Sequence, residues 1–315
     1  MASLTPSLST ENITNFRDVA KIINASNASN QPTLNAGLFY RSALPSTASP
    51  EARANLSTKY HIKTILDLRT DTEISEQEKE KQQRPPKPTK NPSTSSLSSL
   101  SPLPSSTTTT PTPPPPPPKT AHISLNGPSY SLALIKQLPY HQTLKLALLY
   151  TLPSYRPAAI SILGKNVMAA RGLSGLAIDT LTHSTSEVAQ VFALLAHPAN
   201  YPVLVHCTQG KDRTGLVVLL VCLLCGVGAE AVDGDYMRSG VELEPERVER
   251  VREIARIGLP ASFAGCEEGW VGVVGGWLER EWGGVEGYLE KGCGVERGVL
   301  ERVRGVLVAR GAGGE

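Results

Sequence analysis

The sequence predicts an α/β domain with a largely parallel central sheet flanked by helices and interrupted by a disordered insertion. Residues 61–70 hold the apolar positions Ile62, Ile65, Leu66 and Leu68, and residues 201–206 are YPVLVH, so both segments are typical of buried strands. Helical patterns lie between and after them, and this alternation is typical of a parallel sheet. Between residues 75 and 120 the composition changes to charged residues followed by Ser, Thr and Pro. We therefore expect residues 1–74 and 121–310 to form one domain around this insertion.

The composition of the chain excludes several classes of protein. Its 315 residues are 40% hydrophobic, which is enough for a core, and the net charge of +2 lacks the basic excess of a general nucleic-acid binder. An odd number of cysteines, five, is no disulfide framework and suits a reducing compartment. The start of the chain has no basic segment followed by an apolar core, so we expect no signal peptide. We expect a cytoplasmic protein.

The most apolar segment of the chain, residues 215–229, raises the question of a membrane span. Its 15 residues fall short of the roughly 20 that a spanning helix needs. Helices that are apolar on all sides also occur in the cores of large domains. We therefore expect a buried core helix that does not span a membrane. Cys222 and Cys225 lie in this segment, and we expect them to pack there as small apolar residues.

The insertion at residues 75–120 contains almost nothing that can be buried. Ordering it would cost backbone entropy without a compensating gain, so we expect disorder, with polyproline II character around Pro113 to Pro118. A run of this kind can dock SH3 or WW modules. The alternative, which we favour, is a tolerated surface insertion.

Helical spacing of apolar residues continues after the insertion. It predicts helices over residues 139–149 and 173–195, the second of which contains a regular pattern from residue 186 onward with Ser186 as its cap. Pro198 then ends the helical pattern before the strand at 201–206. The last third of the chain, residues 242–310, predicts short amphipathic helices separated by glycines, with its tryptophans as packing residues.

The sequence VLVHCTQGKDRTGLVVLL, residues 203–220, places a polar loop between a predicted strand and a predicted helix. The N–H groups at the start of a helix are unpaired and carry positive partial charge, so this geometry favours a bound phosphate. The Walker A pattern is absent. Instead, five residues separate Cys207 from Arg213, which lets the loop amides and a bidentate guanidinium surround one phosphate.

The residue types in this loop also suit covalent chemistry. Beside a helix N-terminus and an arginine, the pKa of a cysteine thiol falls to roughly 3.5–7.5, so it becomes a nucleophile at neutral pH. Thr214 can donate its hydroxyl to the thiolate, and His206 can brace the loop. We expect Cys207 and Arg213 to be catalytic. We expect the phosphate to be bound by the remaining loop residues Thr208, Gln209, Gly210, Lys211 and Thr214.

The stretch HCTQGKDRTG, residues 206–215, resembles the H-C-x5-R-[ST] signature of cysteine-dependent phosphatases. It is most similar to the branch of tyrosine phosphatases related to the bacterial IphP-type enzymes. Further segments resemble motifs of that family in the same order: residues 11–19, 37–46, 65–73, 232–240 and 282–295. The resemblance covers most of residues 11–308 apart from the insertion. It implies a protein-tyrosine-phosphatase-like fold.

The resemblance also implies a reaction. Cys207 attacks phosphorus to form a phosphocysteine intermediate, which water hydrolyses, and Arg213 with the loop amides stabilises the transition state. No metal or other cofactor is needed. The substrate would be phosphotyrosine in proteins, with phosphoserine and phosphothreonine as further candidates.

Several assignments stay open at this stage. The general acid is Asp212, which the family context favours, or Asp179. The alternative for Asp179 is a helix or turn residue that takes no part in catalysis. Lys211 either binds a second phosphate, which would suit a phosphoinositide, or holds an acidic neighbour. A third possibility for the whole chain is a phosphate-binding module without turnover.

A set of charged residues outside the loop is expected to form ion pairs that hold the strands behind it. These are Arg17, Asp18, Arg41, Asp67 and Arg69.

Overall fold

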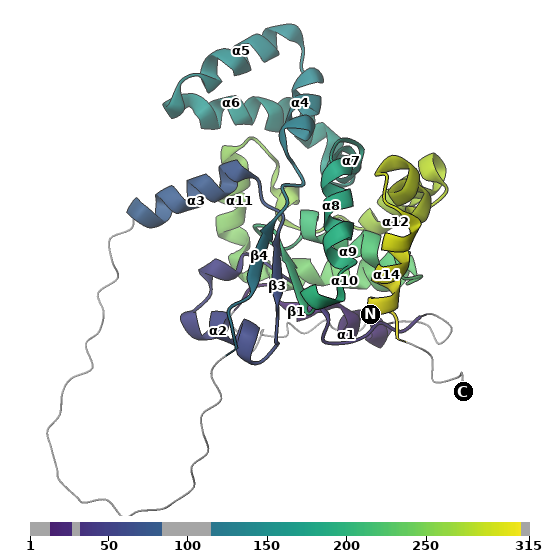
Figure 1. The fold of residues 1–315 in the computed structure, drawn as a ribbon. Coiled ribbons are helices and arrows are strands. Elements are labelled where there is room, and N and C mark those ends of the chain that lie inside the picture. Colours follow the sequence, from purple (N-terminus) through teal and green to yellow (C-terminus); the bar gives the residue numbers. More distant parts are fainter. Residues whose placement is uncertain (1–12, 27–31, 84–114, 310–315) are drawn as a thin grey trace, which may run out of the picture.

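A five-stranded sheet lies at the centre of the computed structural model, which describes residues 13–26, 32–83 and 115–309 (Figure 1). The strands are β1 (Arg17–Asp18), β2 (Phe39–Ser42), β3 (Thr64–Asp67), β4 (Lys119–His122) and β5 (Val203–His206). Their order is β1-β2-β5-β3-β4, and only β1 is antiparallel to its neighbour. The predicted α/β architecture with a largely parallel sheet is confirmed.

Strand β5 occupies the middle of the sheet because both of its faces are apolar. Val203 and Val205 pack into the main core with helices on one face, and Leu204 packs into a smaller cluster on the other. This alternation follows from the two-residue period of a strand. The loop that follows β5 is therefore anchored at the most buried point of the sheet.

Helix α9 (Asp212–Leu224) follows the loop, and its side chains from Thr214 to Cys222 are all buried. The expected core helix is thus confirmed, and Cys222 and Cys225 are buried free thiols. No helix within the described residues has the length and hydropathy to cross a bilayer.

The remaining helices cover the two faces and one end of the sheet. Before the long insertion these are α1 (Val19–Ser26), α2 (Pro50–Thr58) and α3 (Asp71–Gln83). Around β5 they are α7 (Ala169–His183), α8 (Thr185–Leu195) and α10 (Ala229–Glu242). The last are α11 (Arg247–Arg256), α12 (Trp270–Trp282), α13 (Val285–Gly287) and α14 (Arg297–Leu307). The short helices expected over residues 242–310 are present, and the buried ring of Trp270 stacks on that of Tyr236 at 4.5 Å.

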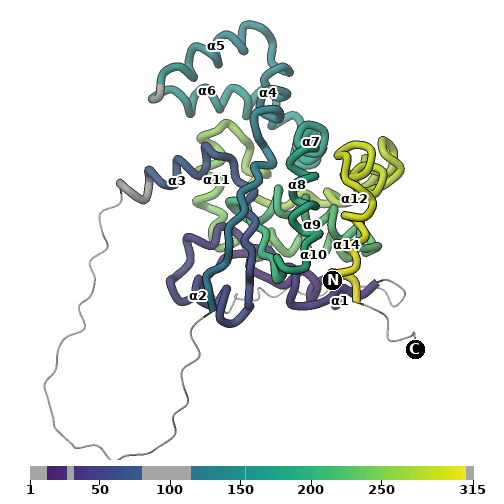
Figure 2. The backbone as a smooth tube through the Cα atoms, in the orientation of Figure 1, coloured from purple at the N-terminus to yellow at the C-terminus, as the bar shows by residue number. Residues whose placement is uncertain are grey.

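A helical projection, residues 128–168, extends away from the sheet (Figure 2). It consists of α4 (Pro128–Lys136), α5 (Tyr140–Tyr150), α6 (Arg156–Leu163) and a π-helical turn at Gly164–Met168. It has a small core of its own, which includes Leu134, Leu146 and Ile162. The helix expected at 139–149 is α5, displaced by one residue.

The helical segment expected over residues 173–195 consists of two helices. Ser184 has φ −122° and ψ 35°, which ends α7 and makes this residue the N-cap of α8. The predicted cap, Ser186, is therefore wrong by two residues. The Ser184 hydroxyl donates instead to the carbonyl of Leu125, a contact that the local pattern does not reveal.

The predicted limits of the insertion are wrong at both ends. Residues 75–83 belong to α3, and residues 119 and 120 belong to β4, which pairs with β3. Glu, Gln and Lys are good helix formers, so a charged composition by itself did not exclude a helix. The rest of the predicted disordered segment, residues 84–114, lies outside the described residues, so its disorder stays a prediction.

Candidate active site

The loop between β5 and α9 is held from behind through its peptide carbonyls. Four consecutive carbonyls accept hydrogen bonds of 2.6–3.3 Å. The donors are the Leu44 amide and the side chains of Asn15 and Arg41, and the acceptors are the carbonyls of Thr208, Gln209, Gly210 and Lys211. In a trans peptide the N–H lies opposite the C=O. The amides of residues 209–212 therefore face the opposite, concave side of the loop, where an anion would bind.

Gly210 is the one position in the loop where only glycine fits. Its φ is +66°, which side chains rarely adopt, and a Cβ there would lie 2.1 Å from the Ser42 carbonyl oxygen. Close contact between the loop and β2 therefore requires the missing side chain. The same contact brings Arg41 within reach of the loop carbonyls.

Cys207 and Thr214 lie at the two ends of the loop, and both are buried. Within the described residues the Thr214 hydroxyl is buried without a hydrogen-bond partner. A buried hydroxyl without a partner is costly, so it marks a position where a charged acceptor is expected. The thiolate of Cys207 would be such an acceptor. The sequence predicts that the Thr214 hydroxyl donates to the thiolate, and in the structure this hydroxyl is available to do so.

His206 and Asp67 support the start of the loop. The Nδ1 of His206 lies 3.0 Å from the Cys207 carbonyl oxygen, to which it donates, because a carbonyl can only accept. Burial lowers the pKa of His206, which opposes a charged imidazole. Asp67 on the adjacent strand is paired with Arg69 at 2.6 Å, and this pairing outweighs burial and lowers the pKa of the Asp67 carboxyl.

Arg213 is held by Glu73, from the first turn of α3. Its two terminal nitrogens donate to the two carboxylate oxygens of Glu73 at 2.6 and 2.7 Å, and Thr208 donates to the same carboxylate at 2.7 Å. Burial raises the pKa of Glu73, but the Arg213 hydrogen bonds outweigh it and bring the pKa to about 2. Burial lowers the pKa of Arg213 and Glu73 more than compensates, so it lies above its ordinary value. Glu73 therefore fixes the direction of the guanidinium.

A second ion-pair network lies behind the loop and is fully buried. Asp235 of α10 accepts from Arg17 at 2.7 Å and from Arg41. Burial raises the pKa of Asp235, but the two arginines outweigh it and lower the pKa. Arg41 also donates to the Gly210 carbonyl at 2.6 Å, so the network positions the loop. Breaking such a buried pair by removing one partner is strongly destabilising.

The side chain of Lys211 is fully buried and directed toward a short helical turn, Ala261–Ala264. Its Nζ donates to the carbonyls of Phe263, at 2.9 Å, and of Gly265. It also lies 3.3 Å from an oxygen of Asp212, one of the acidic neighbours expected in the structural alternative. Any contact between Lys211 and a phosphate would come from its backbone amide.

The two candidate general acids differ in their surroundings. The Asp212 side chain, in the first turn of α9, is 49% exposed at the end of the loop. Asp179 on α7 is buried and accepts from Arg171 through both oxygens, at 2.9 and 2.5 Å. Both oxygens of Asp179 are thus occupied by Arg171, whereas the side chain of Asp212 is open to solvent. The geometry favours Asp212.

Sequence reasoning anticipated the loop and the pairs of Arg17, Arg41, Asp67 and Arg69, although Arg17 and Arg41 pair with an unforeseen acid. Asp18 accepts from the amides of Ala20 and Gly37, whereas an ion pair was expected. Three residues that contact the loop or the arginines around it were not foreseen: Asn15, Glu73 and Asp235. For Glu73 a signal existed, since Thr70 and Glu73 form the T-x-x-E capping box that opens a helix.

Within the described ranges, no group of three or more His, Cys, Asp and Glu side chains is placed to hold a metal ion. The expectation that catalysis needs no metal stays a prediction. The chemistry available here is a thiol, a guanidinium, an oriented set of amides and an exposed carboxyl.

Comparison with known proteins gives one match across the chain and two partial ones. A family model described as "Tyrosine phosphatase family" matches residues 8–309. The chain is 43% identical over 65 residues to the "Triple specificity protein phosphatase PtpB" of Mycobacterium tuberculosis. This alignment covers 21% of this chain and 22% of that protein. It is 39% identical over 67 residues to a "Tyrosine-protein phosphatase" of Nostoc commune, covering 21% and 23%. Each alignment thus spans less than a quarter of the relative.

Proposed function

The chain belongs to the tyrosine phosphatase family, and on that premise we propose that it hydrolyses phosphotyrosine in proteins through a phosphocysteine intermediate. The observation that carries the proposal is the loop, whose carbonyls are bound from behind so that its amides face a single anion site. Cys207 opens this loop and Arg213 ends it. The printed names of both partial relatives describe phosphatases, which supports the same class of reaction.

In the first step the sulfur of Cys207 attacks phosphorus and the bond between phosphorus and the substrate oxygen breaks. Charge on the equatorial oxygens is stabilised by the loop amides and by Arg213, which Glu73 orients. Thr214 donates to the thiolate. Asp212 donates a proton to the leaving oxygen, since its side chain is exposed at the end of the loop.

In the second step a water molecule attacks the phosphorus of the phosphocysteine. The Asp212 carboxylate accepts a proton from this water, the sulfur–phosphorus bond breaks and inorganic phosphate leaves. The thiolate of Cys207 is regenerated, so atoms and charge balance over the cycle. His206 and Asp67 hold the start of the loop throughout and take no part in proton transfer.

Phosphoserine, phosphothreonine and phosphoinositides remain alternative substrates. Lys211 gives little support to a phosphoinositide substrate, because its Nζ donates to the backbone carbonyls of Phe263 and Gly265, away from the anion site. We therefore place phosphotyrosine first.

The test is phosphate release from a phosphotyrosyl peptide, a phosphoseryl peptide and a soluble phosphoinositide, by the wild type and by Cys207→Ser. We expect release to be fastest from the phosphotyrosyl peptide and to be lost in Cys207→Ser, which should still bind the peptide. Appreciable turnover by Cys207→Ser would contradict the mechanism. Tight peptide binding without release by the folded wild type would instead identify a non-catalytic binding module.

A further inference from the structure

Helix α5 of the helical projection exposes a continuous apolar face. Tyr140, Leu144 and Leu148 are 84%, 61% and 67% exposed, and their spacing of four residues places them on one side of the helix. The opposite side, with Leu146, forms the small core of the projection. The apolar surface is therefore additional to what this helix needs for its own packing.

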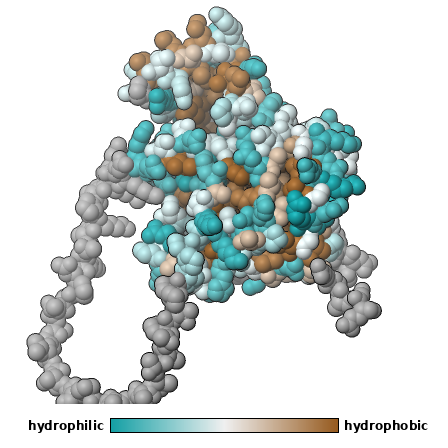
Figure 3. Space-filling model, viewed as in Figure 1, coloured by the Kyte–Doolittle hydropathy of each residue, from teal (hydrophilic) through white to brown (hydrophobic). Residues whose placement is uncertain are grey.

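The projection carries further exposed apolar residues. They are Leu132 on α4, Tyr150 at the end of α5, and Leu152 and Tyr155 after it. In the space-filling view, brown atoms cover part of the projection at the top of the molecule, and further brown atoms lie on the body below it (Figure 3). Single exposed apolar residues need no explanation, but a contiguous patch marks an interaction surface.

The charge of the projection is as distinctive as its apolar face. No Asp or Glu occurs between residues 81 and 178, whereas the projection has four basic residues: Lys136, Lys145, Arg156 and Lys165. All four are exposed, and none has a carboxylate partner within the described residues. Arg156 lies instead over the ring of Tyr150, 5.4 Å from its centroid.

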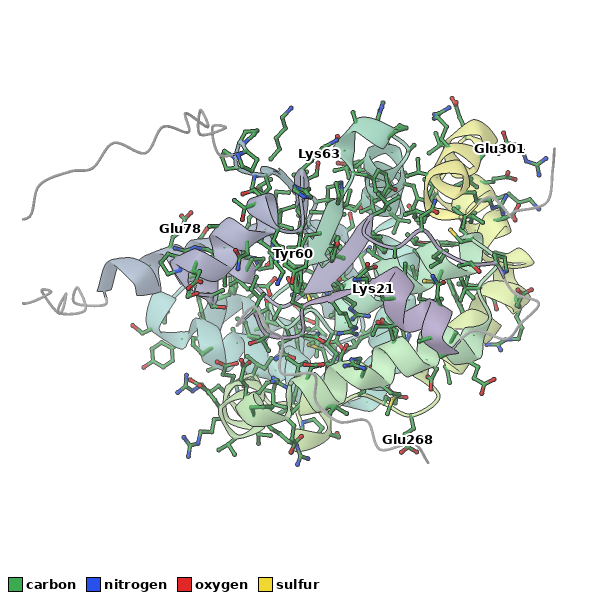
Figure 4. All side chains as sticks on the ribbon, turned by 90° about the horizontal axis from the view of Figure 1, so that it is seen from below. Lys21, Tyr60, Lys63, Glu78, Glu268 and Glu301 are labelled. Carbon is green, nitrogen blue, oxygen red and sulfur yellow. The ribbon has the colours of Figure 1, made fainter. Side chains whose placement is uncertain are left out.

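The rest of the chain has the opposite charge balance. Setting aside these four residues leaves 27 of the 31 basic residues against all 29 acidic ones, so the remainder is net negative. Glu78, Glu268 and Glu301 are examples that lie at the periphery of the body (Figure 4). The molecule thus presents one basic and apolar end and one weakly acidic body.

We propose that the helical projection docks on an anionic phospholipid bilayer. An apolar helix face flanked by lysine and arginine lies at the boundary of headgroups and acyl chains, and the basic residues add attraction to anionic lipids. The tyrosines suit this boundary because their rings are apolar and their hydroxyls polar. A second copy of the chain is a poorer occupant, since two faces of the same positive charge would repel.

The inference does not rest on the proposed catalytic reaction, because binding to vesicles requires no turnover.

The first test is sedimentation of the full-length wild type with vesicles of phosphatidylcholine alone and of phosphatidylcholine mixed with phosphatidylserine. We expect binding to the mixed vesicles that weakens as salt is raised, because exposed charges are screened. Equal binding to both kinds of vesicle, or binding to neither, would overturn the proposal. This comparison needs no variant and so does not depend on any variant folding.

The second test uses two double variants that change exposed apolar residues in different places. Leu144→Ser with Leu148→Ser should weaken binding to mixed vesicles about tenfold or more, since two side chains no longer enter the lipid. Val248→Ser with Val273→Ser is the matched control, because these valines are 68% and 48% exposed on α11 and α12 of the body. Both variants should keep the far-ultraviolet circular dichroism and the urea unfolding midpoint of the wild type, which shows that they are folded.

Two outcomes of the second test would contradict the proposal. One is an equal loss of vesicle binding in the control variant, which would mean that apolar residues anywhere on the surface contribute. The other is self-association of the wild type in sedimentation equilibrium that Leu144→Ser with Leu148→Ser abolishes. That result would assign the apolar face to contact between copies.

Discussion

The carboxylate of Glu73 holds Arg213 through a bidentate contact. A free arginine side chain loses about 2 kcal/mol of rotamer entropy when it is immobilised, and a phosphate that had to order it would bind more weakly by part of that amount. The bidentate contact with Glu73 removes most of this cost before binding. It also explains why α3, far from the loop in sequence, belongs to the site.

Glu73→Gln should lower kcat/KM for a phosphotyrosyl peptide by about tenfold or more, because an amide offers one acceptor oxygen and no charge to the guanidinium. Peptide hydrolysis by purified variants measures this. Glu76→Gln is the matched control, since Glu76 is exposed on the same helix. Unchanged kinetics in Glu73→Gln would show that Arg213 needs no carboxylate to adopt its working position.

The same contact predicts a dependence of stability on pH. The pKa of Glu73 lies at about 2 in the folded protein against 4.5 ordinarily, so the pair contributes fully above pH 4.5 and its contribution is lost as pH falls toward 2. After discounting for solvent exposure, this amounts to about 1–2 kcal/mol. Urea unfolding at pH 6 and pH 3 should show a smaller difference in unfolding free energy for Glu73→Gln than for the wild type. Equal differences would rule out this contribution.

Asp212→Asn should slow hydrolysis of alkyl phosphates and phosphopeptides, whose leaving groups need a proton, by about a hundredfold. Aryl phosphates with acidic leaving groups should lose far less. A panel of phenyl phosphates with graded leaving-group pKa measures this dependence. Asp179→Asn serves as the control: it breaks the pair with Arg171 and should affect all leaving groups equally. The reverse pattern would assign the proton to Asp179.

At the residue scale, the sequence predicts a contact only when its partners are close together along the chain. Cys207, Arg213 and Thr214 are separated by a few residues on a strand–loop–helix unit, so their meeting follows from spacing. Asp235 meets Arg41 across 194 residues, and no local pattern indicates that pairing. The direction of Lys211 also depends on a distant segment, at Phe263 and Gly265.

At the scale of elements, α3 and β4 show where composition misleads. The predicted disordered insertion included most of α3 because its residues are charged, yet its capping box and helix-forming residues fold it. The side chains of strand β4 are mostly exposed and show no apolar alternation. This strand is defined only by the pairing of its backbone with that of β3. Edge strands are held by main-chain hydrogen bonds that a hydrophobic pattern cannot show.

Thr70→Ala should destabilise the protein by about 1 kcal/mol, because the Thr70 hydroxyl caps the start of α3. It should also reduce activity, since Glu73 depends on this turn for its position. Thr72→Ala is the control, because Thr72 is exposed in the first turn of α3. Chemical denaturation with parallel kinetics measures both effects. A loss of stability without any loss of activity would separate the cap from the site.

At the scale of the whole molecule, the α/β class followed from the sequence because β5 and α9 are apolar on all sides and can only lie in a core. The structure also defines how much of the insertion can be removed. Deletion of residues 84–114 with a short flexible linker should leave phosphate release and the unfolding midpoint close to those of the wild type. Deletion of residues 76–119 removes most of α3 and the first residue of β4, so it should lower both. Equal effects of the two deletions would show that neither element matters.

The buried supports of the loop have a consequence for how the protein is made. Asn15 and Arg41 are translated early, whereas Asp235 and the carbonyls of Phe263 and Gly265 emerge from the ribosome only after the loop itself. In a nascent chain, Cys207 therefore lies in a loop that still lacks some of its buried supports. The loop becomes able to act on a phosphate only late in translation, and truncated products should lack this activity.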